Sequence, residues 1–272
     1  MKTRQEKLEA FGRILDILDE LRVKCPWDRE QTTQSLRPQT IEEVYELSDA
    51  ILKDDMKNIS KELGDVLLHV LFYAKIGEEQ NEYDIVDVIN FLSDKLIYRH
   101  PHVFSSVEVA DSAEVVKNWE MLKTKEKDGN RRILSGVPDT LPPLLKAYRM
   151  QDKARGVGFD WEEKSQVWDK VKEEMNEYQA ELDAIEAAES EEDRAVAFAR
   201  AEVELGDYLF AVVNAARLYG LNPDTALERT CAKFKRRFTY LEEHTIRQGR
   251  NLKDMTLAEM DEIWDEAKAK GL

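Results

Sequence analysis

The segment ELGDYLFAVVNAARLYG, residues 204–220, begins with two acids, Glu204 and Asp207, and continues with apolar side chains on nearly every helical face. It recurs as ELGDVLLHVLFYAKIG at residues 62–77. A helix that is apolar almost all round is typical of a buried central helix. Acids three residues apart share one face of such a helix, and buried carboxylates are costly unless they are paired or bind a metal ion. The two segments therefore predict two buried helices, each with a carboxylate pair.

The same landmarks surround both segments in the same order. A helix with two glutamates precedes each segment, and a Lys–Arg pair and a tryptophan follow it. The landmarks are Glu43, Glu46, Lys95, Arg99 and Trp119 in the first half, and Glu174, Glu177, Lys233, Arg237 and Trp264 in the second. This repeat predicts a duplicated module. The wider spacing in the second half predicts an insertion, acidic and rich in alanine, between Glu177 and Glu204.

The composition of the 272-residue chain predicts an all-α protein. Turn-forming residues are scarce, with 11 glycines and 7 prolines, and Glu, Lys, Ala and Leu are abundant. The segment GVPDTLPP, residues 136–143, concentrates proline and predicts a linker. We expect tandem duplicated four-helix-type bundles, with an N-terminal domain over residues 1–135 and a C-terminal domain over residues 144–272.

The charge and the cysteine count exclude several classes of protein. A formal net charge of −16 disfavours direct nucleic-acid binding and attraction to an anionic membrane. Two isolated cysteines form no disulfide framework. Charges run through the first 24 residues, and the longest apolar stretch, residues 66–74, is too short to cross a bilayer. The sequence therefore predicts a cytoplasmic protein with no membrane partner.

The carboxylates of the second half predict a metal site. Two helices with a short connection pack antiparallel, which brings Glu174 and Glu177 toward Glu204 and Asp207. Hard divalent cations prefer such oxygen ligands, so we expect Mg²⁺, with Mn²⁺ as the alternative. In the first half, Glu43, Glu46, Glu62 and Asp65 predict a vestigial site. There the expected buried stripe lies opposite Glu43 and Glu46 and consists of Ile41, Val44, Tyr45, Ser48, Ile51 and Leu52.

Cations extend the carboxylate stripes of the second half. Lys170 precedes Glu174 by one helical turn, and Arg200 precedes Glu204 by the same spacing. Asn214 lies on the stripe of Asp207 as a polar ligand or hydrogen-bonding group. A metal ion surrounded by cations describes a polyphosphate site, which the pair Lys233 and Arg237 would complete. Trp264 is either a stacking surface for a base or part of the core.

With these motifs, the chain resembles the MazG family of two-domain nucleoside triphosphate pyrophosphohydrolases over essentially its whole length. The motifs are EExxE…ExxD, CPWDREQT (25–32), HPHVF (100–104) and GVGFDW (156–161). The resemblance implies the all-α NTP pyrophosphatase fold, a homodimer, and Mg²⁺-dependent cleavage of NTPs and dNTPs to monophosphate and pyrophosphate, with broad base tolerance and a role in nucleotide-pool control. It implies metal ligands at Glu174, Glu177, Glu204 and Asp207, and nucleotide contacts at Lys170, Arg200, Lys233, Arg237 and Trp264.

Comparison of the two copies predicts that the C-terminal one is catalytic. Gln39 stands where the second half has Lys170, Asn58 where it has Arg200, and Phe72 where it has Asn214. The expected mechanism is metal-assisted attack of water at the α-phosphorus, with Glu173 or one of the metal-bound carboxylates as general base. A di-iron bundle is excluded because no histidine follows a glutamate by three residues. The alternative is a non-catalytic helical regulator that binds a nucleotide or a protein.

Overall fold

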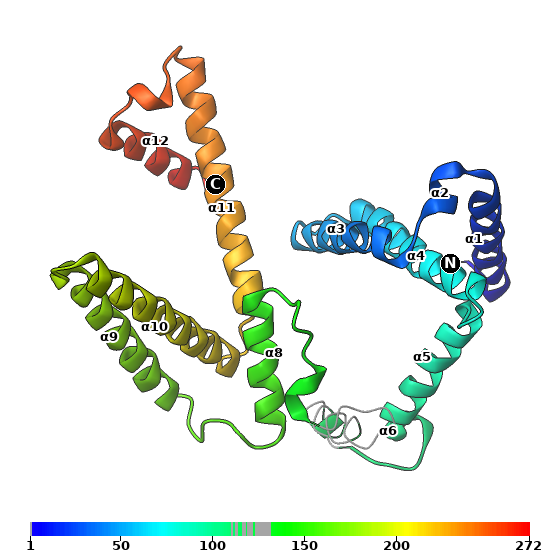
Figure 1. Cartoon of the computed structure of the whole chain (residues 1–272). Coiled ribbons are helices and arrows are strands. Elements are labelled where there is room, and N and C mark those ends of the chain that lie inside the picture. Colours follow the sequence, from blue (N-terminus) through cyan, green and yellow to red (C-terminus); the bar gives the residue numbers. More distant parts are fainter. Residues whose placement is uncertain (1, 110, 112–113, 116–117, 119–121, 123–131) are drawn as a thin grey trace. The chain divides into compact units, whose positions relative to one another are not determined.

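The computed structural model describes residues 2–109, 111, 114, 115, 118, 122 and 132–272. Over these residues the regular structure is entirely helical, which confirms the all-α class. The chain divides into two units, Met1–Ala110 and Asp111–Leu272 (Figure 1). The proline-rich segment 136–143 lies inside the second unit, and Trp119 lies outside the described residues.

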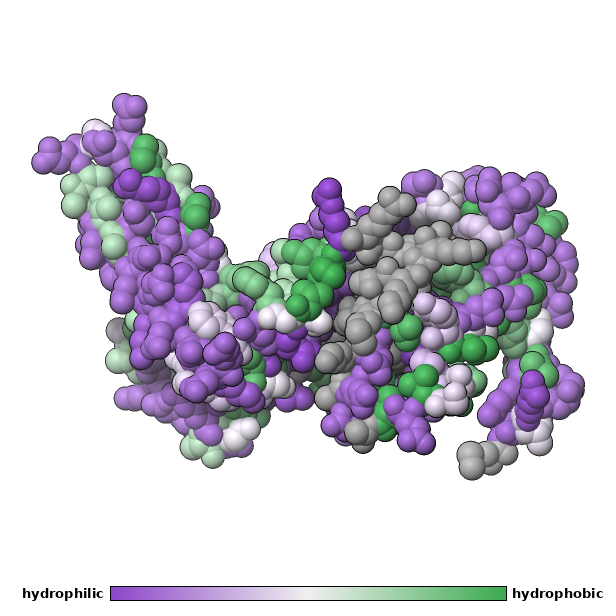
Figure 2. Space-filling model, turned by 90° about the horizontal axis from the view of Figure 1, so that it is seen from below, coloured by the Kyte–Doolittle hydropathy of each residue, from purple (hydrophilic) through white to green (hydrophobic). Residues whose placement is uncertain are grey.

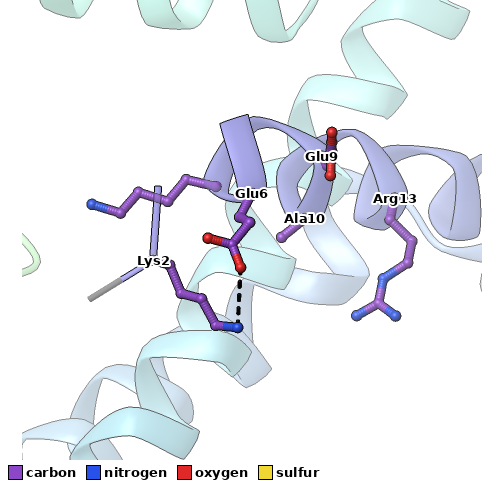
Figure 3. A pocket seen from close by; sticks show the side chains of 6 residues that line it. Lys2, Glu6, Glu9, Ala10 and Arg13 are labelled. Carbon is purple, nitrogen blue, oxygen red and sulfur yellow. Dashed lines mark hydrogen bonds and ion pairs between the residues drawn. The ribbon is translucent and has the colours of Figure 1, made fainter. Parts of the chain in front are cut away.

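The first unit is built around an antiparallel helical hairpin. Its helices are α1 (Arg4–Lys24), α2 (Pro26–Glu30), α3 (Thr33–Leu52), α4 (Met56–Glu79), α5 (Ile85–Arg99) and α6 (Pro101–Phe104). Helices α3 and α4 pack together, and α1 packs on α4 (Figure 1). Side-chain caps set the helix starts, because Thr32 and Asp55 accept hydrogen bonds from the first-turn amides of α3 and α4. At the start of α1, an ion pair joins Lys2 to Glu6 beside a shallow surface pocket (Figure 3).

Large side chains fill the interior of this unit. Leu18 of α1, Leu36 of α3, and Leu71, Phe72 and Ile76 of α4 form its core cluster.

A buried arginine closes the same unit at the far end of α4. Arg22 donates hydrogen bonds to the carboxylate of Glu79 and, over 3.2 Å, to the carbonyl oxygen of Gln31. It thereby fastens α1 and the segment after α2 to the end of α4.

The second unit repeats the hairpin with longer arms. Its helices are η1 (Ile133–Gly136), α8 (Pro143–Gly156), α9 (Gln166–Ala187), α10 (Glu191–Leu218), α11 (Pro223–Arg247), η2 (Leu252–Asp254) and α12 (Leu257–Ala269). Helices α9 and α10 lie side by side, α8 packs on α10, and α12 folds back on α11 (Figure 1). The turns between the arms, Lys53–Asp55 and Ala188–Ser190, are equally short. The insertion in the second copy therefore lengthens both helices.

The core of the second hairpin consists of small side chains. Val167 and Val171 of α9 pack against Ala211 and Ala215 of α10. These residues leave more room between the arms than the leucines and the phenylalanine of the first hairpin.

Two expectations about burial were wrong for the single chain. The apolar residues Ile41, Val44, Tyr45 and Ile51 are exposed, because α3 turns its other face, with Leu36, Thr40, Glu43 and Ala50, toward α4. Both helices that were expected to be buried also expose apolar residues, namely Leu63, Leu67 and Val70 of α4 and Val203, Leu205, Leu209 and Phe210 of α10. Apolar side chains reach the surface among hydrophilic ones (Figure 2). Over the described residues, no helix is long and apolar enough to span a membrane.

Candidate functional site

Three predicted metal ligands meet between the arms of the second hairpin. Glu174 of α9 and Glu204 and Asp207 of α10 offer carboxylate oxygens that lie within 4.8 Å of one another. Glu174 is only 6% exposed, whereas Glu204 is half-buried and Asp207 is exposed, so the expected burial of the α10 carboxylate pair was wrong for the single chain. Glu177 lies one turn further along α9 and groups in the same way with Glu173 and Glu174. The antiparallel pairing of α9 and α10 therefore brings Glu174 together with Glu204 and Asp207, and Glu177 adjoins Glu174 on the same helix.

Burial and the neighbouring acids disfavour the ionised form of Glu204. Partial burial and the negative charges of Glu177, Asp207 and Glu174 raise the pKa of the Glu204 carboxyl above its ordinary value. A bound cation would relieve this repulsion, because it favours the ionised form of each carboxylate. The cluster therefore has the oxygen ligands of a site for a hard divalent cation, and the closely spaced negative charges that such a cation would neutralise.

Two predicted cations lie on the same hairpin. The Nζ atom of Lys170 is 2.6 Å from a carboxylate oxygen of Glu174 and 2.8 Å from one of Glu173. The hydrogen bonds to Glu173 and Glu174 raise the pKa of Lys170. Arg200 does not pair with Glu204; its Nε atom lies 3.0 Å from Glu181 on α9. Both cations thus lie on the arms that carry the acids, one directly on the cluster and one beyond it.

Asn214 holds a buried arginine that the sequence analysis missed. Its Oδ1 atom accepts hydrogen bonds from Nε (3.0 Å) and Nη2 (2.8 Å) of Arg217, and Arg217 donates to Asp160 over 3.1 Å. Burial opposes ionisation of Asp160, but hydrogen bonds from Arg217 and from the Trp161 amide lower its pKa overall. The signal was present in the sequence, because Arg217 shares a helical face with Asn214 and Asp160 belongs to GVGFDW.

A pocket of about 680 Å³ opens beside the carboxylates. Helices α8, α9 and α10 and the segment 158–161 line it, and Lys170, Glu174 and Asp207 form its acidic end. Gly158 adopts a φ of +88°, a left-handed conformation that side chains other than glycine rarely take, and this turns the chain into the pocket wall. The carboxylate cluster therefore lies at one end of a cavity with room for an organic ligand.

The remaining predicted contacts lie on α11 and α12. Arg237 donates from Nε to the carbonyl oxygen of Leu272 over 2.7 Å, and its guanidinium lies 5.9 Å from the ring centre of Trp264. Trp264 also contacts Phe234, with 5.1 Å between ring centres. Among the described residues that line the pocket, neither Arg237, Trp264 nor Lys233 is present. The predicted site residues thus lie in two groups, one between the hairpin arms and one on the C-terminal helices.

The first hairpin carries an acidic cluster at the equivalent place. Glu43, Glu62 and Asp65 offer oxygens within 4.8 Å of one another, and Lys61 pairs with Glu62 at 3.0 Å and with Asp65 at 3.8 Å. Burial and the nearby acids Asp65, Glu46 and Glu62 raise the pKa of Glu43. Glu46 lines a neighbouring pocket of about 560 Å³ together with Glu62. Four acids of the first half therefore gather as the repeat predicts.

The cation pair of the first copy lies on α5. Lys95 places its Nζ atom 5.5 Å from the ring centre of Phe91, and Arg99 lies one turn further along the helix. The α5 pair thus matches the pair Lys233 and Arg237 on α11, in keeping with the duplication.

Comparison with known proteins gives the family. A family model described as the MazG nucleotide pyrophosphohydrolase domain matches residues 31–104. A nucleoside triphosphate pyrophosphohydrolase of Escherichia coli (strain K12) is 38% identical over 268 residues, which cover 96% of this chain and 98% of that protein. The nucleoside triphosphate pyrophosphohydrolase/pyrophosphatase MazG of Thermotoga maritima is 38% identical and is aligned over 95% of both chains. The uncharacterized protein YabN of Bacillus subtilis is 46% identical over 97% of this chain and 53% of its own length.

The similarity to the proteins of E. coli and T. maritima extends over nearly the full length of both partners, and the residues that the family model matches include both helices of the first hairpin. The chain is therefore an enzyme of the MazG nucleotide pyrophosphohydrolase family.

Proposed function

We propose that the site between α9 and α10 hydrolyses nucleoside triphosphates between the α- and β-phosphates, releasing a nucleoside monophosphate and pyrophosphate. One observation carries the proposal: the Glu174–Glu204–Asp207 cluster forms one end of a pocket that also contains Lys170. The acids supply hard oxygen ligands, and the pocket supplies space for the rest of the substrate. The names of the E. coli and T. maritima relatives support the same reaction.

The donor set fits Mg²⁺, with Mn²⁺ as the alternative. Glu174, Glu177, Glu204 and Asp207 would hold the cation, since all four offer the carboxylate oxygens that such cations prefer. A divalent cation in this place supplies Lewis-acid polarisation of the phosphoryl oxygen and a bound water of lowered pKa.

The side chains of the hairpin have separate roles in this proposal. Lys170 carries positive charge at the acidic end of the pocket, where it offsets negative charge on the phosphates. Glu173 is exposed beside Lys170 and accepts the proton of the attacking water, with the metal-holding carboxylates as the alternative base. Arg200, held by Glu181, adds positive charge further along the hairpin.

We also propose that the working form is a homodimer. Apolar side chains remain exposed on α10 and α11 of the single chain, among them Leu205, Leu209, Leu227 and Phe234. Burial of apolar area is the main driving force of association, and a second copy offers the same surface. Lys233, Arg237 and Trp264 on α11 and α12 are proposed to bind the nucleotide within this assembly.

The two copies are proposed to have different roles. Residues 144–272 would form the catalytic domain, residues 136–143 the linker, and residues 1–135 a non-catalytic domain. The large core side chains of the first hairpin favour the second candidate function, a regulator without catalysis, for that domain alone. We propose broad tolerance for NTPs and dNTPs, and a cytoplasmic role in controlling the nucleotide pool.

The test is the position of the bond that is cleaved. The full chain is incubated with ATP, CTP or dUTP and Mg²⁺ in heavy-oxygen water, and the products are analysed by mass spectrometry. We expect the monophosphate, carrying the heavy oxygen, and unlabelled pyrophosphate, with turnover lost in a chelator. A nucleoside diphosphate with orthophosphate, or an absence of turnover with either cation, would contradict the proposal.

A further inference from the structure

The last turn of α12 is fastened to the middle of α11, where the chain end marked C lies in Figure 1. The hydroxyl of Tyr240 on α11 donates a hydrogen bond to the carboxylate of Glu266 on α12 over 2.8 Å. Lys270 pairs with Glu266 at 2.7 Å, and its Nζ atom lies 4.6 Å from the ring centre of Tyr240. Ala267, between them on α12, is fully buried. These contacts give the segment after α12 a defined place beside α11.

A left-handed glycine ends α12 and turns the chain back. Gly271 has a φ of +79°, a conformation that residues with a side chain rarely adopt. The amide of Gly271 donates to the carbonyl oxygen of Lys268 over 2.9 Å, and the amide of Leu272 donates to that of Ala267 over 3.1 Å. Such a hydrogen-bonded turn is a common way to end a helix. It fixes the direction in which the backbone oxygen of Leu272 points.

This backbone oxygen contacts Arg237 of α11. The Nε atom of Arg237 donates a hydrogen bond to it over 2.7 Å. The guanidinium also lies 5.9 Å from the ring centre of Trp264 on α12. Both contacts come from α12 or from the turn that follows it. The end of α12 therefore sets the orientation of an arginine that belongs to another helix.

The contact with Leu272 leaves the outer edge of the guanidinium open. Among the residues that the structure describes, no acceptor bonds to either Nη atom of Arg237. The two Nη atoms offer parallel N–H groups, which match two oxygens of a phosphate group. Lys233 lies one turn earlier on the same face of α11 and adds a second positive charge. The arginine thus uses one donor for its own support and keeps a pair of donors for an anion.

We propose that the backbone oxygen of Leu272 is a positioning group for phosphate binding, which holds Nε of Arg237 so that the Nη pair is presented to the phosphates of the substrate. The inference rests on the proposed function, which assigns Arg237 to the nucleotide. An arginine that is already held in the free protein loses less conformational freedom when it binds, so affinity rises without a further contact to the ligand. Leu272 itself touches no substrate and acts through Arg237 alone.

A double-mutant cycle on Arg237 tests this role. Gly271→Val puts a β-branched residue at a positive φ, so the turn is expected to open and to withdraw the oxygen of Leu272. An added Cβ meets no atom within 4 Å, so the change introduces no clash. The probe is α,β-methylene-ATP with Mg²⁺, which the full chain cannot cleave between the α- and β-phosphates. Gly271→Val should raise its Kd by about threefold to tenfold. In a chain that carries Arg237→Ala, the same change should have no further effect.

Gly249→Val is the matched control. Gly249 ends α11 with a φ of +66°, and an added Cβ there also meets no atom within 4 Å. Its amide donates to Ile246 over 2.9 Å, and that of Arg250 donates to Thr245 over 3.1 Å, which is the hydrogen-bond pattern of the turn at Gly271. The contacts of Arg237 with Leu272 and Trp264 do not involve the turn at Gly249. The Kd of this variant should equal that of the unchanged chain, and thermal melts check that both glycine variants fold.

The outcomes separate positioning from other roles. An unchanged Kd in Gly271→Val would overturn the proposal, as would an equal loss with and without Arg237, which would mean that the turn acts on the fold. Tighter binding would show that Leu272 withholds Arg237 from the phosphates, which also contradicts it. If the cycle behaves as expected but no triphosphate is cleaved, the positioning role stands and the proposed reaction fails.

Discussion

The two hairpins gather the same acids but differ in what lies next to them. In α3–α4, Thr40 Oγ1 lies 3.0 Å from His69 Nδ1 and 2.5 Å from the hydroxyl of Tyr73. Burial lowers the pKa of His69, despite the charge of Asp65. In α9–α10 the corresponding residues are Val171, Ala211 and Ala215, which are small and apolar. A polar trio thus fills the first hairpin at the place where small residues leave room beside the second acidic cluster.

The presence of a carboxylate cluster does not by itself show which of the two hairpins is catalytic. Both clusters bring three oxygens within 4.8 Å, so both have the ligands for a cation. The first adjoins a pocket of about 560 Å³ on the side of Lys53 and Asn58, near the turn of its hairpin. The second adjoins the pocket of about 680 Å³ on the opposite side, which reaches Asn214 and Arg217. The side of the acids on which space opens is therefore the feature that would separate a catalytic copy from a structural one.

The largest expected effect comes from the central acids of the two hairpins. Glu174→Gln removes a charged ligand at the centre of the second cluster, so kcat for pyrophosphate release should fall by at least about a hundredfold. Glu43→Gln is the matched change in the first cluster and should leave kcat unchanged. Thermal melts of both variants check that they fold. Equal losses in the two variants would show that the first hairpin is also catalytic.

Next in size is the effect of the cations on α11 and α5. Arg237→Ala should lower kcat/KM by roughly tenfold to a hundredfold for ATP, CTP and dUTP alike, because phosphates are common to all substrates. Arg237→Lys should not restore activity, since lysine lacks the two parallel N–H donors of a guanidinium. Arg99→Ala, the equivalent change in the first copy, should have no effect. A loss confined to one base would assign Arg237 to base selection.

An exchange between the copies tests the role of space. Ala211→His places the side chain of the first hairpin in the second and should lower kcat/KM by about tenfold, because it fills the pocket beside Asp207. The reverse change, His69→Ala, should lower the melting temperature without changing activity, since it opens a cavity in the first unit only. An Ala211→His variant that folds and retains full activity would contradict this account of the difference.

The smallest expected effect concerns stability and pH in the first unit. Hydrogen bonds from Arg22 lower the pKa of the Glu79 carboxyl below its ordinary 4.5, although burial opposes them. A carboxyl with a lowered pKa stabilises the folded state above its unfolded pKa, and this contribution is lost as the pH falls through the folded-state pKa. The free energy of unfolding should therefore decline below about pH 4.5, as Glu79 takes up a proton.

Replacing Arg22, the ion-pair partner of Glu79, isolates the contribution of this pair to stability. Arg22→Met should lower the free energy of unfolding at pH 7 by about 1 kcal/mol, a value that allows for the partial exposure of Glu79. The difference from the unchanged chain should shrink in acid, where Glu79 is protonated in both proteins. Denaturant titrations at several pH values measure it. A difference that is constant with pH would mean that Arg22 acts through packing alone.

The sequence predicts those features that depend on spacing within one helix. The acids of α9 and α10 share faces through i and i+3 spacing, and Lys170 precedes Glu174 by one turn, so their grouping follows once the two helices pair. The all-α fold follows likewise from composition and periodicity. These local rules hold because the helical repeat fixes the direction of each side chain.

Features that depend on which helix packs against which, and in what register, were not predictable from helical spacing. The face of α3 that packs inward carries Thr40 and Glu43, because α4 offers the matching His69 and Asp65. Arg200 reaches across the hairpin to Glu181, a contact set by the register between two helices. The burial of Gln151 depends on the packing of α8 on α10, where its Nε2 atom donates to the carbonyl oxygen of Phe210. Nothing in the sequence around Gln151 predicts this contact, nor that its Oε1 atom has no donor among the described residues.

The short turn at Ala188–Ser190 has a consequence for how such a protein can change. Residues added there extend both arms of the α9–α10 hairpin outward, away from Glu174 and Asp207, so the register of the acids is undisturbed. The tip of the hairpin therefore tolerates insertions and deletions after a gene duplication, as an exposed loop does. It is also the natural position for an engineered tag or fluorescent probe, which would report on the hairpin without touching its chemistry.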